Sequence, residues 1–209
     1  MKKKIWSLEY SITLFILLGI FMFMVPLRFE NYFQAYMISR WNDRFEKVSY
    51  LFSVINTQIT DEILISFSKA DTSEQREKLL LQLIKPYLRL SVLENSRRYN
   101  PKYLSGKKVV KKDFFHFKDL YYTERQIVGV KDIKQNPENN ALFMLMFDIN
   151  GFLPPNTWGR DIYGLYIYDG GKVVPFGYNK DMDELQIDCS EDGSGTSCSY
   201  YYRIGGGWK

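Results

Sequence analysis

The stretch from Tyr10 to Leu27 contains no charged residue, and this stretch constrains the chain more than any other feature. With Ile5 to Glu9 before it, it would form a helix about 34 Å long at 1.5 Å per residue. A bilayer's hydrocarbon core is about 30 Å thick, so a transmembrane helix is predicted from Ile5 to Leu27. The competing prediction is a secretory signal peptide, but no small-residue cleavage site follows the apolar run.

The charges around this stretch predict an orientation. Lys2, Lys3 and Lys4 precede it, and only Arg28 follows it directly. Positive residues stay on the cytoplasmic side, which predicts a cytoplasmic N-terminus and an extracytoplasmic remainder. We therefore expect a single-pass protein of the inner (cytoplasmic) membrane, with the membrane as a partner.

Two residues of the predicted transmembrane helix from Ile5 to Leu27 carry a resemblance. Glu9 is its only charge, and Pro26 follows seventeen residues later. A basic leader, an early glutamate, an apolar helix and a proline at this spacing resemble the N-terminal segment of type IV pilins and type II secretion pseudopilins. The resemblance implies other pilin-like subunits as partners through this helix. It also implies that Glu9 meets a neighbour's N-terminal amine and that Pro26 marks a bend.

The same resemblance implies a prepilin peptidase that cuts just before the apolar segment, between Lys4 and Ile5. The family has glycine before the cleavage point, and Lys4 departs from that pattern. Whether the leader is removed therefore stays open. An alternative for Glu9 is a place at the headgroup level, where its carboxylate costs little.

Four parts are predicted along the chain. They are a basic leader and transmembrane helix (1–28), a helical arm with a second helix (29–90), a basic connector (91–118) and an antiparallel β head (119–209). Apolar residues recur every three or four positions from Phe29 to Phe67, which predicts a helix to about Ser68. Thr72 and Gln75 predict a capping box for the second helix.

The basic connector could meet nucleic acid or anionic lipid. Its lysines and arginines cluster between Arg97 and Lys118. Because no nucleic-acid-binding motif accompanies them, a solvated surface is favoured and no nucleic acid partner is expected.

Short turn-bounded runs predict the strands of the head. The runs are Tyr121–Tyr122, Gln126–Val130, Ala141–Phe147, Ile162–Tyr168, Lys172–Val174 and Tyr200–Ile204. Parallel strands would need crossover helices, which are missing, so the sheet should be antiparallel. The predicted fold class is α+β, with a long N-terminal transmembrane and amphipathic helix before a small antiparallel sheet.

Four residues between two strands form a candidate calcium site. Asp148, Asn150, Asn156 and Asp161 are oxygen-bearing side chains in a loop that also contains Gly151. Hard oxygen ligands are what calcium prefers, but the EF-hand pattern is incomplete. The alternative is turn chemistry alone, in which Asn and Asp bond to the nearby backbone.

This loop also resembles part of the C-terminal head of bacterial pilin-like proteins that carry a prepilin-type N-terminal segment. The resemblance covers residues 118 to 209. Some pseudopilins bind calcium in this domain, which makes calcium a possible cofactor.

The cysteines predict a disulfide and exclude other chemistry. Cys189 and Cys198 flank a polar loop and should form a disulfide in an exported domain. With one histidine and two cysteines, zinc sites of the usual spacing are excluded and an enzyme is not expected.

Two functions are compatible with these patterns. The leading hypothesis is a structural subunit of a type IV pilus or a type II secretion pseudopilus. The alternative is a single-pass membrane-anchored extracytoplasmic ligand-binding domain. Its surface would be formed by exposed aromatic residues of the head, namely Trp158, Tyr200, Tyr201, Tyr202 and Trp208. Buried aromatic packing is the competing explanation for these residues.

Overall fold

A computed structural model describes residues 8–58, 67, 69–93, 99–109, 120–133 and 140–208. The chain divides into two compact units, Met1–Tyr36 and Met37–Lys209. We call the second unit the head and describe each unit by itself.

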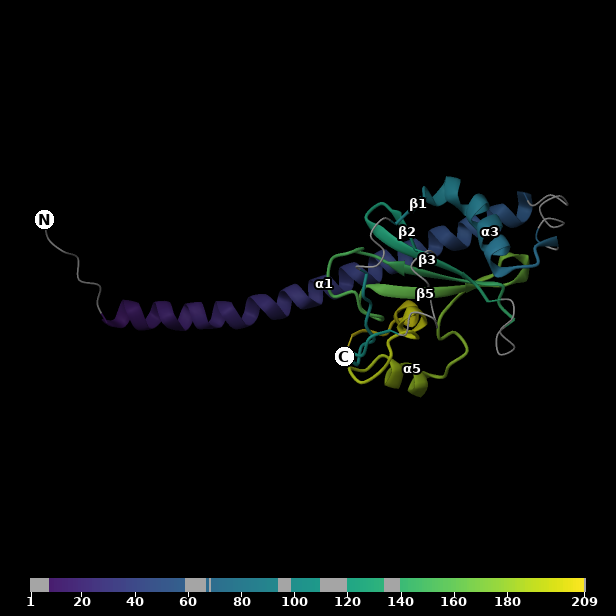
Figure 1. Cartoon of the computed structure of the whole chain (residues 1–209). Helices are drawn as coiled ribbons and strands as arrows, with labels where there is room; N and C mark the ends of the chain where they lie inside the picture. Colours follow the sequence, from purple (N-terminus) through teal and green to yellow (C-terminus); the bar gives the residue numbers. More distant parts are fainter. Residues whose placement is uncertain are drawn as a thin grey trace, which may run out of the picture. The chain divides into compact units, whose positions relative to one another are not determined.

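The described part of the first unit is helical. Helix α1 (Leu8–Gln58) begins there and continues past Pro26 without interruption (Figure 1). Among the residues that the structure describes, no helix is both long and apolar enough to cross a membrane. The predicted span from Ile5 to Leu27 begins outside the described residues. The proposed processing junction of Lys4 and Ile5 lies entirely outside them.

Within the head, the second half of α1 is amphipathic. Trp41, Val48 and Phe52 lie on its buried side, while Asp43 and Lys47 form an exposed ion pair one turn apart. An apolar stripe of this kind is what a helix needs in order to pack on a sheet. The helix was predicted to reach about Ser68; α1 ends at Gln58, and residues 59–66 and 68 lie outside the described residues.

The second helix has the predicted start. Helix α3 (Ser73–Leu88) begins with a capping box in which Thr72 accepts from the Gln75 backbone N–H and the Gln75 side chain accepts in return. Pro86 lies in its last turn, and the helix ends two residues later. Both boundaries therefore follow from local sequence.

The head contains a six-stranded sheet with its strands in sequence order. The sheet is antiparallel, as predicted. The strands are β1 (Ser91–Val92), β2 (Leu120–Thr123), β3 (Gln126–Asp132), β4 (Phe143–Asp148), β5 (Ile162–Ile167) and β6 (Val173–Pro175). The turn η3 (Asp169–Gly171) joins the last two strands. Strand β1 was not predicted, because it consists of two residues in the presumed connector.

The predicted strand from Tyr200 to Ile204 is wrong. These residues form the end of helix α6 (Cys198–Tyr201) and the 3-10 turn η4 (Tyr202–Ile204). Adjacent side chains of Tyr201 and Tyr202 are both buried, which a helical turn permits and a strand with one covered face does not. A short helix that was not predicted, α5 (Met182–Asp188), starts at a capping box of Asp181 and Glu184.

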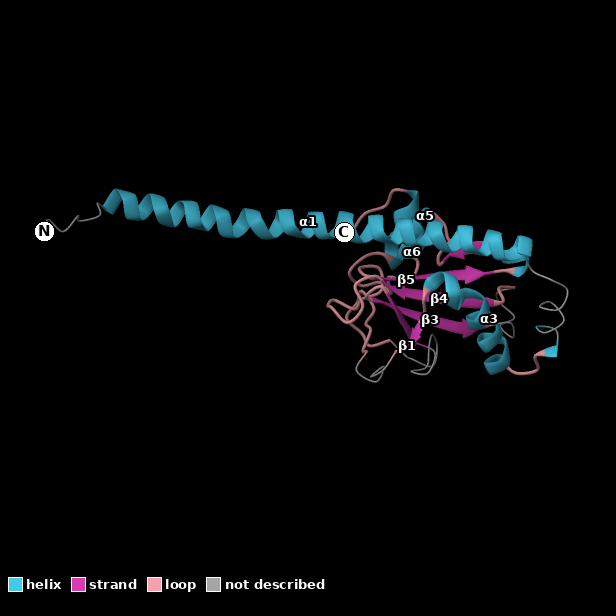
Figure 2. Ribbon diagram, turned by 90° about the horizontal axis from the view of Figure 1, so that it is seen from above, coloured by secondary structure: helices cyan, strands magenta, loops and turns pink. Residues whose placement is uncertain are grey.

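The sheet is covered on both faces, and Figure 2 shows α1 and α3 beside it. On one face, Trp41 of α1 stacks on Tyr163 with ring centroids 5.0 Å apart, and Arg76 of α3 pairs with Asp132 of β3 at 2.6 Å. The opposite face is covered by a cluster that includes Trp158 and Phe176. Covered faces explain why β4 is buried at every position.

Candidate functional site

The loop between β4 and β5 contains the four residues predicted to bind calcium. Asp148 ends β4, and its side chain is fully buried. One carboxylate oxygen accepts the Gly151 backbone N–H at 2.8 Å, and the other accepts the Tyr99 hydroxyl at 2.8 Å. Asp148 therefore connects the loop to the segment of Tyr99, whose ring belongs to the cluster of Trp158 and Phe176 on one face of the sheet.

Asp161 holds the other end of the loop. Its carboxylate oxygens accept the backbone N–H groups of Asn156 at 2.8 Å and Thr157 at 2.6 Å. With the Asn156 amide oriented to donate, its nitrogen lies 3.1 Å from the Asp148 carboxylate and 2.7 Å from the Gly151 carbonyl oxygen. The two aspartates thus fix both ends of one turn.

Gly151 is required by the backbone of this turn. Its φ of 70° lies in the left-handed region, and a Cβ atom there would stand 2.4 Å from the Arg125 carbonyl oxygen. Only glycine combines this conformation with so close an approach.

Burial changes the acidity of the loop. Burial, with a further contribution from the charge of Asp161, raises the pKa of Asp148 well above its usual range. Burial also raises the pKa of Asp161 to about 6, against the opposing effect of its backbone hydrogen bonds. Burial and the nearby Asp148 raise the pKa of Tyr99, which keeps its hydroxyl protonated and able to donate.

The geometry favours turn chemistry in this loop. The carboxylates accept backbone N–H groups, and the Asn150 amide donates to the Pro154 carbonyl oxygen at 3.1 Å. Within the described residues, no group of three or more His, Cys, Asp or Glu side chains is placed to hold a metal. Calcium binding by Asp148, Asn150, Asn156 and Asp161 stays a prediction.

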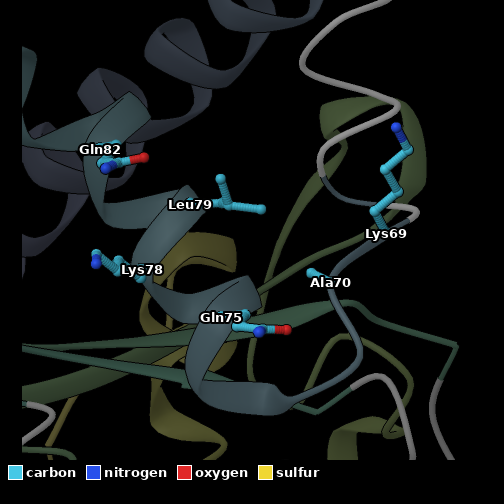
Figure 3. Close-up of a pocket in the computed structure, with 6 residues that line it drawn as sticks. All are labelled: Lys69, Ala70, Gln75, Lys78, Leu79 and Gln82. Atoms are coloured by element: carbon cyan, nitrogen blue, oxygen red, sulfur yellow. The ribbon is translucent and has the colours of Figure 1, made fainter.

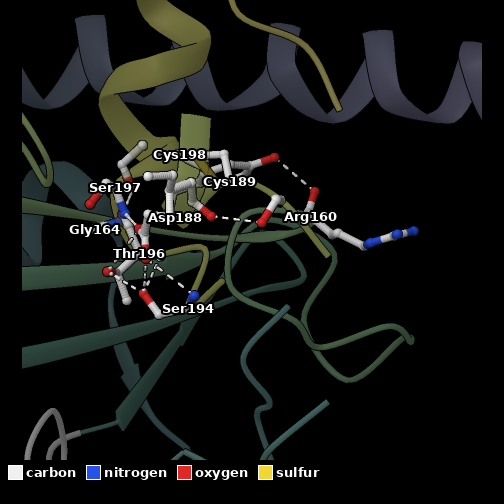
Figure 4. The surroundings of a disulfide bond; sticks show 12 residues. Arg160, Gly164, Asp188, Cys189, Ser194, Thr196, Ser197 and Cys198 are labelled. Atoms are coloured by element: carbon white, nitrogen blue, oxygen red, sulfur yellow. Dashed lines mark hydrogen bonds between the residues drawn. A yellow bond between two sulfur atoms is a disulfide. The ribbon is translucent and has the colours of Figure 1, made fainter. Parts of the chain in front are cut away.

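The predicted disulfide is present. Cys189 and Cys198 are bonded, with their Cα atoms 5.5 Å apart. Asp188 braces the enclosed loop, since its carboxylate accepts from Ser194 and from the Ser197 backbone N–H at 2.7 Å (Figure 4). Burial opposes the charge of Asp188, but these hydrogen bonds hold its pKa below the usual value.

The predicted aromatic binding surface is not formed. Trp158, Tyr201 and Tyr202 are buried, and Trp158 stacks on Phe176 with centroids 5.9 Å apart. Tyr200 and Trp208 are half-buried. These side chains supply core packing because the sheet presents apolar surface on both faces.

Two hollows lie in the described part of the head. One, of about 330 Å³, lies beside α3, where Gln75 and Leu79 point toward the segment of Lys69 and Ala70 (Figure 3). The Gln75 amide oxygen is already used in the capping box. Lys69, Lys78 and Gln82 also line it, and no function is based on this hollow.

The larger cavity, of about 410 Å³, is mostly apolar and lies among α1, α3 and the end of β5. Three charged residues line it. Arg76 and Asp132 are hydrogen-bonded to each other at 2.6 and 2.9 Å, and the Asp169 carboxylate accepts the Gly170 backbone N–H at 2.9 Å. Specific ligand sites need polar groups that converge on the ligand. We therefore base no function on this cavity.

The residues implied in assembly lie on α1. Glu9 is exposed in its first turn, and its backbone carbonyl oxygen accepts the Thr13 hydroxyl at 2.8 Å. The backbone of Pro26 is helical. Neither observation tests the roles that the resemblance implies.

Tyr99 and Asp188 organise the two loops of the head and were not predicted. Tyr99 stands in a stretch without periodicity, so no sequence signal marked its bond to Asp148. Asp188 stands beside Cys189, and an acidic residue before a Ser/Gly-rich loop could have indicated a brace.

In comparisons with known proteins, no family model, no curated protein and no solved structure matches this chain.

Proposed function

We propose that this chain is a structural subunit of a filament of the type IV pilus or type II secretion pseudopilus kind. Its subunits would pack side by side through the first half of α1, and the head would form the outer surface. The chemistry of such a protein is assembly, without catalysis.

One observation carries the proposal. Large apolar side chains are exposed along the first half of α1, among them Phe15 at 75% and Met22 at 74%. They lie on all sides of the helix, since Phe15, Ile16, Leu17 and Leu18 are consecutive and all exposed. A helix that is apolar all round is covered by other protein or by lipid in the working state.

The glutamate gives this packing its specificity. Glu9 has the position from which pilin-like proteins are thought to meet a neighbour's amine, and an unpaired carboxylate among apolar helices would be costly. Membrane anchoring before assembly is part of the proposal and depends on the sequence of residues 2 to 27.

Charge reversal tests the proposal. In the native host, we expect Glu9→Lys to reduce incorporation into sheared or cross-linked filaments at least tenfold. Glu30→Lys is the matched control, because Glu30 is also an exposed acid of α1. We expect Glu30→Lys to assemble like the unmodified chain.

The outcome against the proposal is equal incorporation of the Glu9→Lys and Glu30→Lys chains. Intact mass with and without the host's prepilin peptidase then shows whether a free amine exists at Ile5. A chain that assembles while still beginning at Met1 would keep the filament role and remove the amine as the partner of Glu9.

A further inference from the structure

The loop between β4 and β5 presents two adjacent bulky apolar side chains to solvent. Phe152 is 46% exposed and Leu153 is 66% exposed, although both belong to the folded head. Exposing two such neighbours is unfavourable unless something covers them. We call these two residues the apolar tip.

The tip is held in place. The aspartates at both ends of the loop accept its backbone N–H groups, and the Asn150 amide donates to Pro154 directly after the tip. The Phe152 ring also meets Tyr99 edge-on, with centroids 6.5 Å apart. A loop fixed in this way presents its apolar side chains at little further cost in conformational entropy.

Exposed basic residues lie on two sides of the tip. On one side, the Lys102 backbone N–H donates to Asn156 and its carbonyl oxygen accepts from Trp158, each at 2.9 Å. Lys102 also pairs with Lys108 across a short turn that contains Lys107. All three lysines are exposed.

On the other side is the turn between β2 and β3. Arg125 is exposed there, and its carbonyl oxygen lies directly against Gly151. Figure 1 shows the green segment after β4 beside the teal segment near residue 105 at one end of the sheet, in agreement with these hydrogen bonds.

Five acidic residues of the described part of the chain lie near the tip. Asp148 and Asp161 are buried, and Glu124 pairs with Arg44 at 3.3 Å. Glu191 and Asp192 are exposed in the turn whose Gly193 carbonyl oxygen accepts from Ser105. With Glu124 paired to Arg44, the exposed Lys102, Lys107, Lys108 and Arg125 outnumber the exposed Glu191 and Asp192, so the described surroundings of the apolar tip are net basic.

We propose that this tip and its basic surround contact the surface of an anionic lipid bilayer. Apolar side chains enter the boundary between headgroups and acyl chains, while lysine and arginine are attracted by anionic headgroups. Nucleic acid would use the positive charge but would gain nothing from Leu153, because phosphate contacts are polar. This surface belongs to the head, and the proposal does not depend on filament assembly.

The test places a reporter on the tip of the full chain. Leu153→Cys, with the native disulfide closed, is labelled with an environment-sensitive fluorophore and mixed with vesicles. One vesicle set is phosphatidylcholine alone, and the other contains phosphatidylglycerol. We expect a blue shift with phosphatidylglycerol only, reduced by 0.5 M salt because surface electrostatics are screened.

The matched control is a label at Ile187→Cys, which is 71% exposed on α5 beside acidic residues and should not respond. Changing Lys102, Lys107 and Lys108 to Gln should weaken the affinity for phosphatidylglycerol vesicles, as reported by the label at position 153, about 100-fold. This follows from about 1 kcal/mol of binding free energy per lysine. Circular dichroism of each variant verifies that the head is folded.

Three results would overturn the proposal. They are equal shifts with both vesicle sets, equal shifts at positions 153 and 187, and no shift with either vesicle set. In the last case, a shift produced by duplex DNA or by a protein would identify a different class of partner. A shift that arises only from vesicle binding through α1 would appear at position 187 as well, so the comparison of positions 153 and 187 separates it from this result.

Discussion

The two halves of α1 differ in what covers them. From Tyr10 to Met24 the described apolar side chains are largely exposed, whereas from Met37 to Ile55 most of them are buried within the head. Phe15 is 75% exposed and Trp41 is fully buried, yet both are large aromatic residues of one helix. Apolar composition therefore does not say which surface a helix packs on.

This difference also predicts that the stability of the head and the assembly of filaments depend on different halves of α1. The head covers its own half of α1 and includes a sheet buried on both faces, so its folding should depend on contacts within the chain. The first half of α1 contributes little to that core. Substitutions in the two halves should therefore have effects of very different size.

The largest effect is expected for Trp41→Ala. Its ring stacks on Tyr163, and its indole N–H donates to the Ser199 carbonyl oxygen at 2.8 Å. Removing a fully buried aromatic side chain costs about 3–5 kcal/mol. Urea unfolding of the full chain, followed by near-ultraviolet circular dichroism, measures this loss. A loss below about 1 kcal/mol would contradict the assignment of this half of α1 to the core.

Opening the disulfide should be the next largest effect. Replacing Cys189 and Cys198 together by Ser reopens a loop of about ten residues, which costs roughly 2.5 to 3 kcal/mol in the chain-entropy model. The same urea experiment under oxidising conditions measures the change. Reducing agent should destabilise the unmodified chain by a similar amount and leave the double variant unaffected.

The buried aspartates should make the head's stability depend on pH. Because the folded pKa of Asp161 is about 6 and its unfolded value is about 3.9, the folded state binds more protons between these values. Stability from this group is therefore full below about pH 4 and is lost as pH rises toward 6, by on the order of 2 kcal/mol. Asp148, whose pKa is also raised, acts in the same direction.

Asp148→Asn sharpens this prediction. The amide oxygen can still accept the Gly151 N–H, but the amide nitrogen cannot accept from the Tyr99 hydroxyl or the Asn156 amide. The variant should therefore lose about 1 kcal/mol at low pH, where Asp148 is protonated, and lose part of the pH dependence. Unfolding measured from pH 4 to 8 checks both. A variant whose pH profile equals that of the unmodified chain would show that Asp148 does not titrate in this range.

The smallest effect on stability is expected for Phe15→Ala. Its side chain is exposed, and exposed positions without special contacts change stability by less than about 0.5 kcal/mol. Filament incorporation, in contrast, should fall if this surface packs against other subunits. A loss of head stability comparable to that of Trp41→Ala would remove the distinction between the two halves of α1.

Local signals predicted several parts of the head. The capping box of Thr72 and Gln75 and the alternation of short strands with turns both depend on residues close in sequence. The disulfide followed from two cysteines around a polar loop. Each of these was therefore recoverable without knowledge of the fold.

Long-range contacts decided what local signals could not. Tyr200 to Ile204 has the aromatic composition of a strand, but burial of Tyr201 and Tyr202 next to Tyr163 and the disulfide at Cys198 favour a helical turn. Tertiary packing overrides β-propensity in this way because that propensity mainly reflects packing on a sheet.

The sequence by itself determined the apolar N-terminal stretch, the α+β class, the antiparallel order of strands and the cysteine pair. Only the tertiary structure decided that Asp148 bonds to Tyr99, that Phe152 and Leu153 stay exposed among basic residues, and that α1 is buried only from Met37 onward. Periodicity and turn residues act over a few positions, whereas burial and pKa depend on residues that the fold brings together from distant parts of the chain.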